Sequence, residues 1–427
     1  MSSGPRHLRH KYPPGFQWAW ANYHESPNHV RLQSVNDLSE PSLLRYDTTP
    51  MLSQIFAIAR NTFYESLRQP VTLVVVVAAA LLLVMSNPLA AFTMGEDQRM
   101  LIDLGLATIF LAGAVLASFL ATNVLGREIA NRTALTVISK PVSRPIFMLG
   151  KYFGVLSALL VACLALTLVF MLVEMHSVLQ TVRDPIHVPV MIFGFGGVAL
   201  AVVVAVWCNY FYGMAFTSTV IFVSLPILLV AYVLTLNFDP DFSRHSMAES
   251  FKGNIWLATI ALGMCVAMLA AIAVAVSTRL GQVMTLAVTV GLFVLGLLSD
   301  WIFGRMLRGL ETDWLARASE AGLTTEVEIT TVIERTSGET AEKITLIDEA
   351  TVPLMDMATS GEVVGWGLLK AGYALLPNFQ VLWLSDAVTQ DIVIPTSFLI
   401  QSVSYGLLYA FAALAIGVAL FQRRDLG

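Results

Sequence analysis

The sequence has few charged residues. Asp, Glu, Lys and Arg make up only 13% of the 427 residues, whereas 56% are hydrophobic and the formal net charge is −5. Soluble domains carry about 25% charged residues, and the mean hydropathy here is +0.71. So much apolar surface requires lipid around part of the chain, which excludes a purely water-soluble fold. The mild negative charge also argues against a nucleic-acid partner.

Cysteine is scarce as well. The chain has three, Cys163, Cys208 and Cys265, and each lies within an apolar run. They are too few and too widely spaced for a disulfide framework or a zinc site. We therefore expect buried thiols, with neither metal nor cofactor.

Motifs for catalysis are missing. There is no GxxxxGK[ST], and the nearest text, residues 149–152, lacks both the glycine-rich loop and the hydroxyl residue. This chain is therefore not expected to hydrolyse ATP through a P-loop. Neither HExxH nor GxSxG occurs. We expect a non-catalytic protein.

The apolar runs themselves contain almost no ionisable residues. Asp103, Glu174 and Asp300 lie only at their ends. Carriers driven by ion gradients usually keep a charged residue within the membrane, despite a cost of about 2.5–3.5 kcal/mol on insertion scales. If this protein moves a solute uphill, its energy is expected to enter from outside the bilayer.

Eight runs approach the ~20 residues that a helix needs to cross a bilayer core of ~30 Å. The sequence thus predicts an all-α polytopic membrane protein with about eight transmembrane helices. The expected spans are 71–92, 103–125, 149–173, 188–208, 213–236, 255–278, 281–303 and 395–421.

Basic residues in the short loops set the orientation. With a cytoplasmic N-terminus, one side holds most of them, and the opposite short loops hold only Arg99, Arg183, Arg244 and Lys252. Eight spans then place both termini in the cytoplasm. The basic residues on that side are Arg60, Arg68, Arg127, Arg132, Lys140, Arg144, Lys151, Arg279, Arg423 and Arg424.

Four parts follow from this pattern. Residues 1–50 are polar, lack an apolar signal-peptide core and are expected to form a disordered cytosolic extension, with Met51 as an alternative start. Residues 51–303 form the first part of the transmembrane domain. Residues 304–394 form an external hydrophilic insertion, and 395–427 supply the last span and a cytosolic tail.

The insertion is expected to be a small α+β unit. Residues 306–364 hold twelve acidic residues against four basic ones. Two alternating stretches, 326–335 and 343–347, flank Ser337-Gly338 and predict a β-hairpin. The apolar segment 366–388 is interrupted by Pro377 and fits an interfacial or re-entrant helix.

Two cytoplasmic elements are candidates for contacts with a partner. Residues 51–68 predict an amphipathic helix in the membrane interface, for which anchoring is the simplest role. The longest basic loop, 126–151, starts with helix-forming residues and reaches a turn stiffened by Pro141 and Pro145. It is either a protruding contact for another protein or a plain connector. The candidate residues are Ile55, Phe56, Arg60, Phe63 and Arg68 in the helix, and Arg127, Glu128, Arg132, Thr133, Lys140, Pro141, Val142, Ser143 and Arg144 in the loop.

A series of short motifs resembles ABC-2-type permeases, particularly the branch of multicopper-enzyme-maturation permeases. That family has a Glu after the second span, an (S/K)-P-V-S-R element, an LGK entry to the third span, an LPNF segment and an F-x-R-R-D tail. The matching residues are Glu128, Lys140-Pro141-Val142-Ser143-Arg144, Leu149-Gly150-Lys151, Leu376-Pro377-Asn378-Phe379 and Phe421-Gln422-Arg423-Arg424-Asp425, and 277–300 resembles the penultimate membrane hairpin.

The resemblance covers about 51–427 and implies a permease subunit in a bacterial-type plasma membrane. It further implies a separate cytosolic ABC ATPase that contacts 51–68 and 126–145, and a second permease subunit, identical or related. Two features of this sequence depart from the family's pattern. They are the additional helical hairpin at 188–236 and the length of the external insertion.

Two rivals stay open. One is a carrier driven by an ion gradient, whose transport would respond to ionophores. The other is an assembly or binding protein that acts through its external domain. Copper handling by the external histidines His176, His187 and His245 is a further hypothesis, although nothing in the sequence fixes their mutual geometry.

Overall fold

The computed structural model describes residues 51–93, 95–126, 142–179 and 185–423. All of them belong to one structural unit, Thr49–Gly427. The extension expected at 1–50 lies outside the described residues.

Seven described helices are long and apolar enough to cross a membrane. They agree with seven of the eight expected spans to within a few residues, except that the second and third helices begin six and five residues earlier than expected. These helices are α2 (Pro70–Ala90), α3 (Asp97–Ala121, continued by η2, Thr122–Gly126), α6 (Arg144–His176), α8 (Gly196–Tyr212, preceded by α7, Val188–Val190, and η3, Met191–Phe195), α9 (Phe216–Thr235), α11 (Gly253–Ser277) and α16 (Thr396–Gln422).

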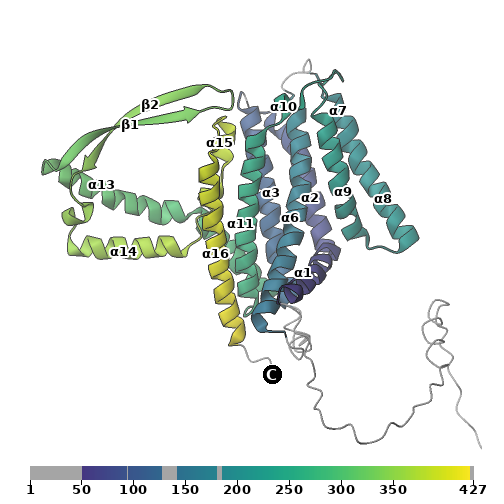
Figure 1. The fold of residues 1–427 in the computed structure, drawn as a ribbon, viewed down its shortest axis with the longest axis horizontal. Coiled ribbons are helices and arrows are strands. Elements are labelled where there is room, and N and C mark those ends of the chain that lie inside the picture. The colour runs from purple at the N-terminus through teal and green to yellow at the C-terminus, as the bar shows by residue number, and fades with distance from the viewer. Residues whose placement is uncertain (1–50, 94, 127–141, 180–184, 424–427) are drawn as a thin grey trace, which may run out of the picture. The chain divides into compact units, whose positions relative to one another are not determined.

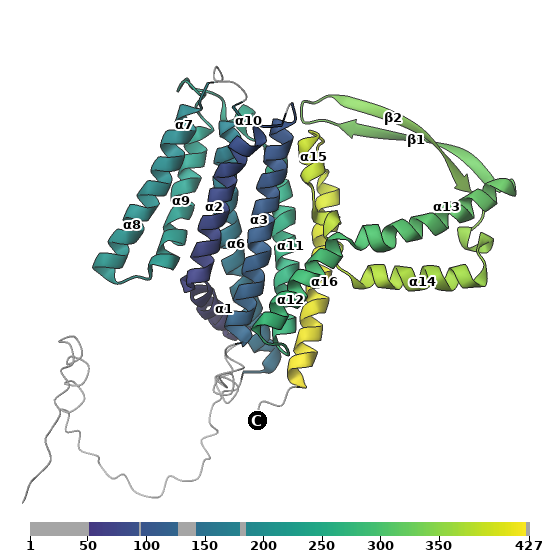
Figure 2. The same cartoon turned by 180° about the vertical axis from the view of Figure 1, so that it is seen from behind.

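The helices stand side by side, with α3, α6 and α11 at the centre (Figure 1, Figure 2). The protein buries 78% of the most apolar stretch of α11 and 67% of those of α3 and α6, but only 22% of those of α2 and α16. Helices at the edge therefore expose side chains such as Leu81 and Phe411. Exposed apolar faces of this extent are compatible with a multi-pass membrane protein.

Small residues allow the central helices to approach one another. A Cβ atom at Gly105 of α3 would lie 2.0 Å from the Phe170 ring of α6, and one at Gly113 would lie 2.6 Å from Val266 of α11. Membrane helices gain most of their association from such close contact. Cys163 and Cys265 are buried in this core as expected, whereas Cys208 is only half-buried.

The region expected as one span at 281–303 is different. Helix α12 (Gln282–Leu297) is followed by η4 (Asp300–Gly304) and α13 (Arg305–Glu320), and the two parts are bent by 42°. The helix thus turns away from the bundle and continues to Glu320, because its second part carries charged residues that α12 lacks. Counting apolar residues could not show this bend.

The expected β-hairpin is confirmed. Strands β1 (Thr324–Glu334) and β2 (Thr340–Ala350) are antiparallel, and their paired residues run from Thr324↔Ala350 to Glu334↔Thr340. Gly338 in the connecting turn has a φ of +83°, a conformation that favours glycine. The chain continues through η5 (Leu354–Met357), α14 (Ser360–Leu375), η6 (Phe379–Leu382) and α15 (Ser385–Thr389).

We call α13, the hairpin and α14 the lateral arm. Figures 1 and 2 show it beside α16, with the turn of the hairpin near α15. There, the Val393 amide donates to the Glu334 carbonyl and the Thr336 amide to the Asp391 carbonyl, both at 2.9 Å. The lateral arm is thus attached to the bundle at both of its ends.

Candidate functional site

The amphipathic helix expected at 51–68 is α1, Met51–Arg68, and it packs across the start of α6. A Cβ atom at Gly150 would lie 2.7 Å from the Cβ of Ile58, and one at Gly154 would lie 2.6 Å from the Ala59 carbonyl oxygen. Two glycines four residues apart occupy one face of a helix. They form a groove in α6 that receives the backbone of α1.

The face of α1 that meets the bundle is only partly the expected apolar face. Leu67, Thr62 and Ser66 are fully buried, whereas Phe56 is 69% exposed. Ile55 and Phe63 are half-buried, and Arg60 and Arg68 are exposed. Close helix contact requires small side chains, so Thr62 and Ser66 point inward and Phe56 outward. The spacing of Thr62 and Ser66, equal to that of the two glycines, was the signal that sequence reasoning missed.

A buried lysine lies beneath α1. The side chain of Lys151 in α6 is 4% exposed, and its Nζ is 3.8 Å from Oε2 of Glu65 in α1. The same Nζ lies 5.7 Å from the centroid of the Phe147 ring. Burying a lysine is costly unless an opposite charge is near. Glu65 therefore ties α1 to α6 electrostatically as well as sterically.

Arg144 connects the end of the basic loop to the end of the chain. Its guanidinium donates to the carbonyls of Phe421, at 3.2 Å, and Gln422, at 2.7 Å. The Phe147 and Phe421 rings stack beside it, with centroids 6.2 Å apart. A cation that binds the last carbonyls of a helix also complements the helix dipole. Arg144 thus fixes the start of α6 to the end of α16.

Amide side chains join three further elements at this end of the bundle. Asn123 in η2 donates to Gln69, between α1 and α2, at 3.2 Å. Gln282 at the start of α12 donates to Asn123 at 3.3 Å. Because η2 ends at Gly126 and α6 begins at Arg144, both borders of the basic loop lie in this region. We call α1, η2, the start of α6 and the end of α16 the coupling surface.

The described residues represent only part of the expected site. Val142 is half-buried, Ser143 is exposed, and Arg144 makes the contacts given above. Exposed Arg60, Arg68, Arg279 and Arg423 make the described surface at this end basic. The residues expected to contact a partner that lie outside the described residues are Arg127, Glu128, Arg132, Thr133, Lys140 and Pro141.

The opposite end of the bundle carries ion pairs. Glu174 at the end of α6 is 2% exposed and accepts hydrogen bonds from Lys252 and Gln98. His245 lies 3.1 Å from Glu249 and 3.4 Å from Asp239. Across the described ranges, no three His, Cys, Asp or Glu side chains are grouped as ligands of a metal.

Comparison with protein-family models finds no match to this chain, and comparison with curated proteins finds none either.

Proposed function

We propose that this chain is the membrane-spanning permease subunit of an ABC transporter of the ABC-2 type, and that the ATPase is a separate cytosolic chain. The observation that carries this proposal is the seating of α1 in the glycine groove of α6, next to both borders of the basic loop. A partner bound there would hold the two elements that the motif resemblance assigns to ATPase contact.

The geometry suggests how force would travel. Helix α6 has 33 residues, a length of about 50 Å at 1.5 Å per residue. The α1 backbone meets it without intervening side chains at Gly154, and Arg144 ties its start to the end of α16. Movement of α1 or of the loop would therefore displace α6 and α16 together rather than distort one side chain.

The proposal also covers the membrane, the orientation of the chain and a second subunit. The chain is a multi-pass protein of a bacterial-type plasma membrane with both termini cytoplasmic, and export is the expected direction. A second permease subunit, identical or related, completes the pathway. The positive charge on the coupling surface supports its cytoplasmic position.

Purification in a mild detergent from the native host tests the proposal. We expect an ABC ATPase to co-purify with the tagged protein, as identified by mass spectrometry. Glu128→Ala combined with Lys140→Ala, both in the basic loop, should remove the ATPase and leave the permease folded. The matched control is Arg244→Ala, which changes an exposed arginine of the opposite end.

Consistent absence of an ATPase from well-folded preparations would contradict the permease assignment. Retention of the ATPase by the double variant would instead move the contact away from the loop.

A further inference from the structure

A pocket of about 680 Å³ lies where the end of α1 meets the turn between α8 and α9. Its volume falls within the range of about 300–1,000 Å³ that is usual for small-ligand sites. Tyr64 and Arg68 of α1 line one side, and α8, α9 and their turn line the other. These two helices are the hairpin by which the sequence departs from the ABC-2 pattern, so the resemblance assigns the pocket no role.

The pocket lies at the level of the cytoplasmic headgroups in the proposed topology. Arg68 is the last residue of α1, and α2 begins two residues later at Pro70. The Thr217 hydroxyl, at the start of α9, donates to the Arg68 carbonyl at 3.0 Å. Helices α2 and α9 have 21 and 20 residues, about 30 Å each, which is the thickness of a bilayer core. Both helices therefore start at the boundary where Arg68 stands.

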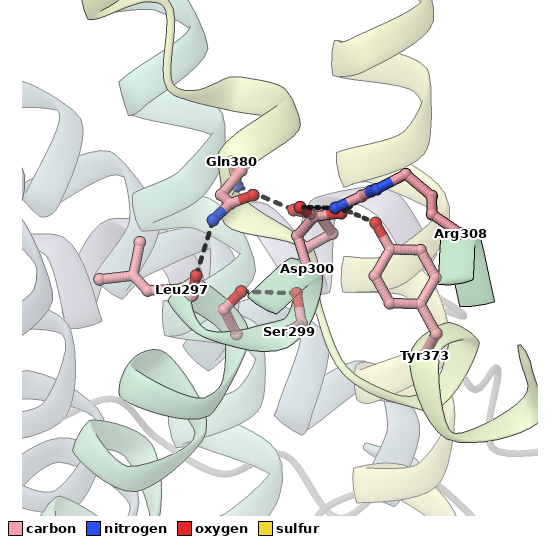
Figure 3. A network of polar contacts seen from close by, with 8 residues as sticks. Leu297, Ser299, Asp300, Arg308, Tyr373 and Gln380 are labelled. Carbon is pink, nitrogen blue, oxygen red and sulfur yellow. Dashed lines mark hydrogen bonds and ion pairs between the residues drawn. The ribbon is translucent and has the colours of Figure 1, made fainter. Parts of the chain in front are cut away.

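The mouth of the pocket is positively charged. Among the described residues that line it, Arg68 carries the one charged side chain, and that side chain is exposed. Arginines elsewhere in the chain have carboxylates beside them: Arg308 donates to both oxygens of Asp300 at 2.9 Å, within the network of Figure 3. The described lining of the pocket offers Arg68 no carboxylate, but it adds the hydroxyls of two exposed tyrosines, Tyr64 and Tyr212. An anion is the ligand that this set of donors fits.

The depth of the pocket is apolar. Cys208 of α8 lies five residues before the turn at Gly213, and Val223 of α9 lies eight residues after Ala215. At 1.5 Å per residue, the lining reaches about 8–12 Å toward the centre of the bilayer, whereas one leaflet of the core is about 15 Å deep. Phe222 also lines this part, and its ring centroid lies 6.1 Å from that of Tyr64. The pocket is thus polar at the headgroups and apolar among the acyl chains.

The turn that closes the pocket is held by its own hydrogen bonds. The Asn209 amide donates to the Met214 carbonyl at 2.6 Å. The Ser218 and Thr219 hydroxyls donate to the Ala215 carbonyl at 3.1 and 2.8 Å. These two hydroxyls are therefore satisfied, and the donors that remain for a ligand are those at the mouth.

We propose that this pocket binds one anionic phospholipid of the cytoplasmic leaflet, with its phosphate on Arg68 and one acyl chain along Cys208 and Val223. A guanidinium matches the paired oxygens of a phosphate. The described lining has no carboxylate that could receive the ammonium group of a zwitterionic headgroup, so its charge favours an anionic lipid. The bilayer itself presents such lipids at the level of Arg68.

A lipid bound there would join α1 to the α8–α9 hairpin. Helix α1 sits on α6 at Gly154, so the lipid would act on the same helix that forms part of the coupling surface. The lipid site depends on the membrane placement proposed above but not on an ATPase partner. Absence of the lipid would therefore leave the ATPase assignment in place, and absence of the ATPase would leave the lipid site in place.

Native mass spectrometry of the full chain in detergent tests the charged part of the site. Phosphatidylglycerol and phosphatidylcholine with the same acyl chains are the added probes, and we expect one phosphatidylglycerol to bind in preference. Arg68→Gln should weaken its binding about fivefold, the effect of one arginine near an anionic lipid surface, and Arg68→Lys should restore most of it. Arg60→Gln changes an exposed arginine of the same helix outside the lining and should bind as the wild type.

A second pair of variants tests the apolar part. Cys208→Trp fills the depth of the pocket while Arg68 is kept, and it should remove the bound phosphatidylglycerol. Val206→Trp places the same side chain at a position of α8 that is 52% exposed and outside the lining. This control should keep the lipid.

Three results would overturn the proposal. Equal weakening by Arg68→Gln and Arg60→Gln, or equal binding of the two lipids, would show that no site selects an anionic headgroup. Unchanged binding by Cys208→Trp would place the acyl chain outside the pocket. Displacement of phosphatidylglycerol by an equal concentration of glycerol phosphate would assign the pocket to a soluble anion instead of a lipid.

Discussion

Glycine and other small residues decide how closely the helices of this protein approach one another. Gly154 receives α1, and Gly417 of α16 leaves room for Met148, whose Cε would lie 2.3 Å from an added Cβ. The sequence alone does not distinguish a glycine in a helix contact from one that faces lipid, because both environments are apolar.

Gly154→Ala tests the seat of α1. The added methyl would lie 2.4 Å from the Cβ of Thr62 and 2.6 Å from the Ala59 carbonyl, so backbone must shift. We expect a loss of about 1–3 kcal/mol, as for overpacking in a core. Thermal unfolding in detergent measures it. Gly291→Ala, where no atom lies within 4 Å of the added carbon, is the control and should not lower the midpoint, because alanine favours a helix more than glycine does; equal midpoints for both variants would count against a tight seat.

The carboxylate of Glu362 gives the lateral arm a dependence on pH. The Arg317 hydrogen bond, together with that of the Thr359 amide, lowers the pKa of Glu362 to about 2. The folded arm thus favours the charged form, and its stabilisation is complete above the ordinary pKa of 4.5 and lost as the pH falls toward 2.

Hydrogen exchange of α13 and α14 measures this effect. We expect protection in the wild type, expressed relative to the intrinsic exchange rate at each pH, to fall between pH 5 and pH 3, about the ordinary titration range of Glu. Glu362→Gln should be weakly protected at both values, whereas Glu339→Gln in the hairpin turn should behave as the wild type. A loss of protection of the same size in Glu362→Gln would assign the transition to another group.

Among the helices and strands, the sequence predicts the observed element where its apolar residues follow one clear pattern. The alternation around Ser337-Gly338 predicted the hairpin, and the apolar runs predicted seven helices to within a few residues for most. The bend between α12 and α13 escaped prediction because Trp301, Ile302 and Phe303 continue the apolar run past Asp300. The burial of Thr62 and Ser66 in α1 escaped prediction because helical periodicity groups residues on a face without saying whether lipid or protein covers it.

Backbone hydrogen bonds attach the turn of the hairpin to the bundle, and one of them can be removed alone. Val393→Pro deletes the amide that donates to Glu334, a loss of about 1 kcal/mol. We expect faster trypsin cleavage at Arg335 and Lys343 in membranes. Val393→Ala keeps the amide and should be cleaved at the wild-type rate. Equal rates for both variants would show that the turn is held by other contacts.

For the whole molecule, the proposed topology places the two ends of α16 on opposite sides of the membrane. The turn of the hairpin lies near the start of α16, and the α11–α12 connection lies near Asn123, in the coupling surface. In intact cells of a Cys208→Ser strain, an impermeant maleimide should label Ser337→Cys. Gly281→Cys should react only after permeabilisation. Labelling of both in intact cells would mean that the chain between them does not cross the membrane.

The lateral arm is attached to the bundle at both ends, so the chain can be cut within the arm without the two fragments separating. A break at Ser337-Gly338 leaves β1 on the first fragment and β2 on the second, and the two remain paired along eleven residues each. The same fragments also meet through Trp314 and Trp366 and through the packing of α16 on α11. The exposed turn is therefore a place where the gene can be divided, and two separately made halves should assemble into one membrane-embedded particle.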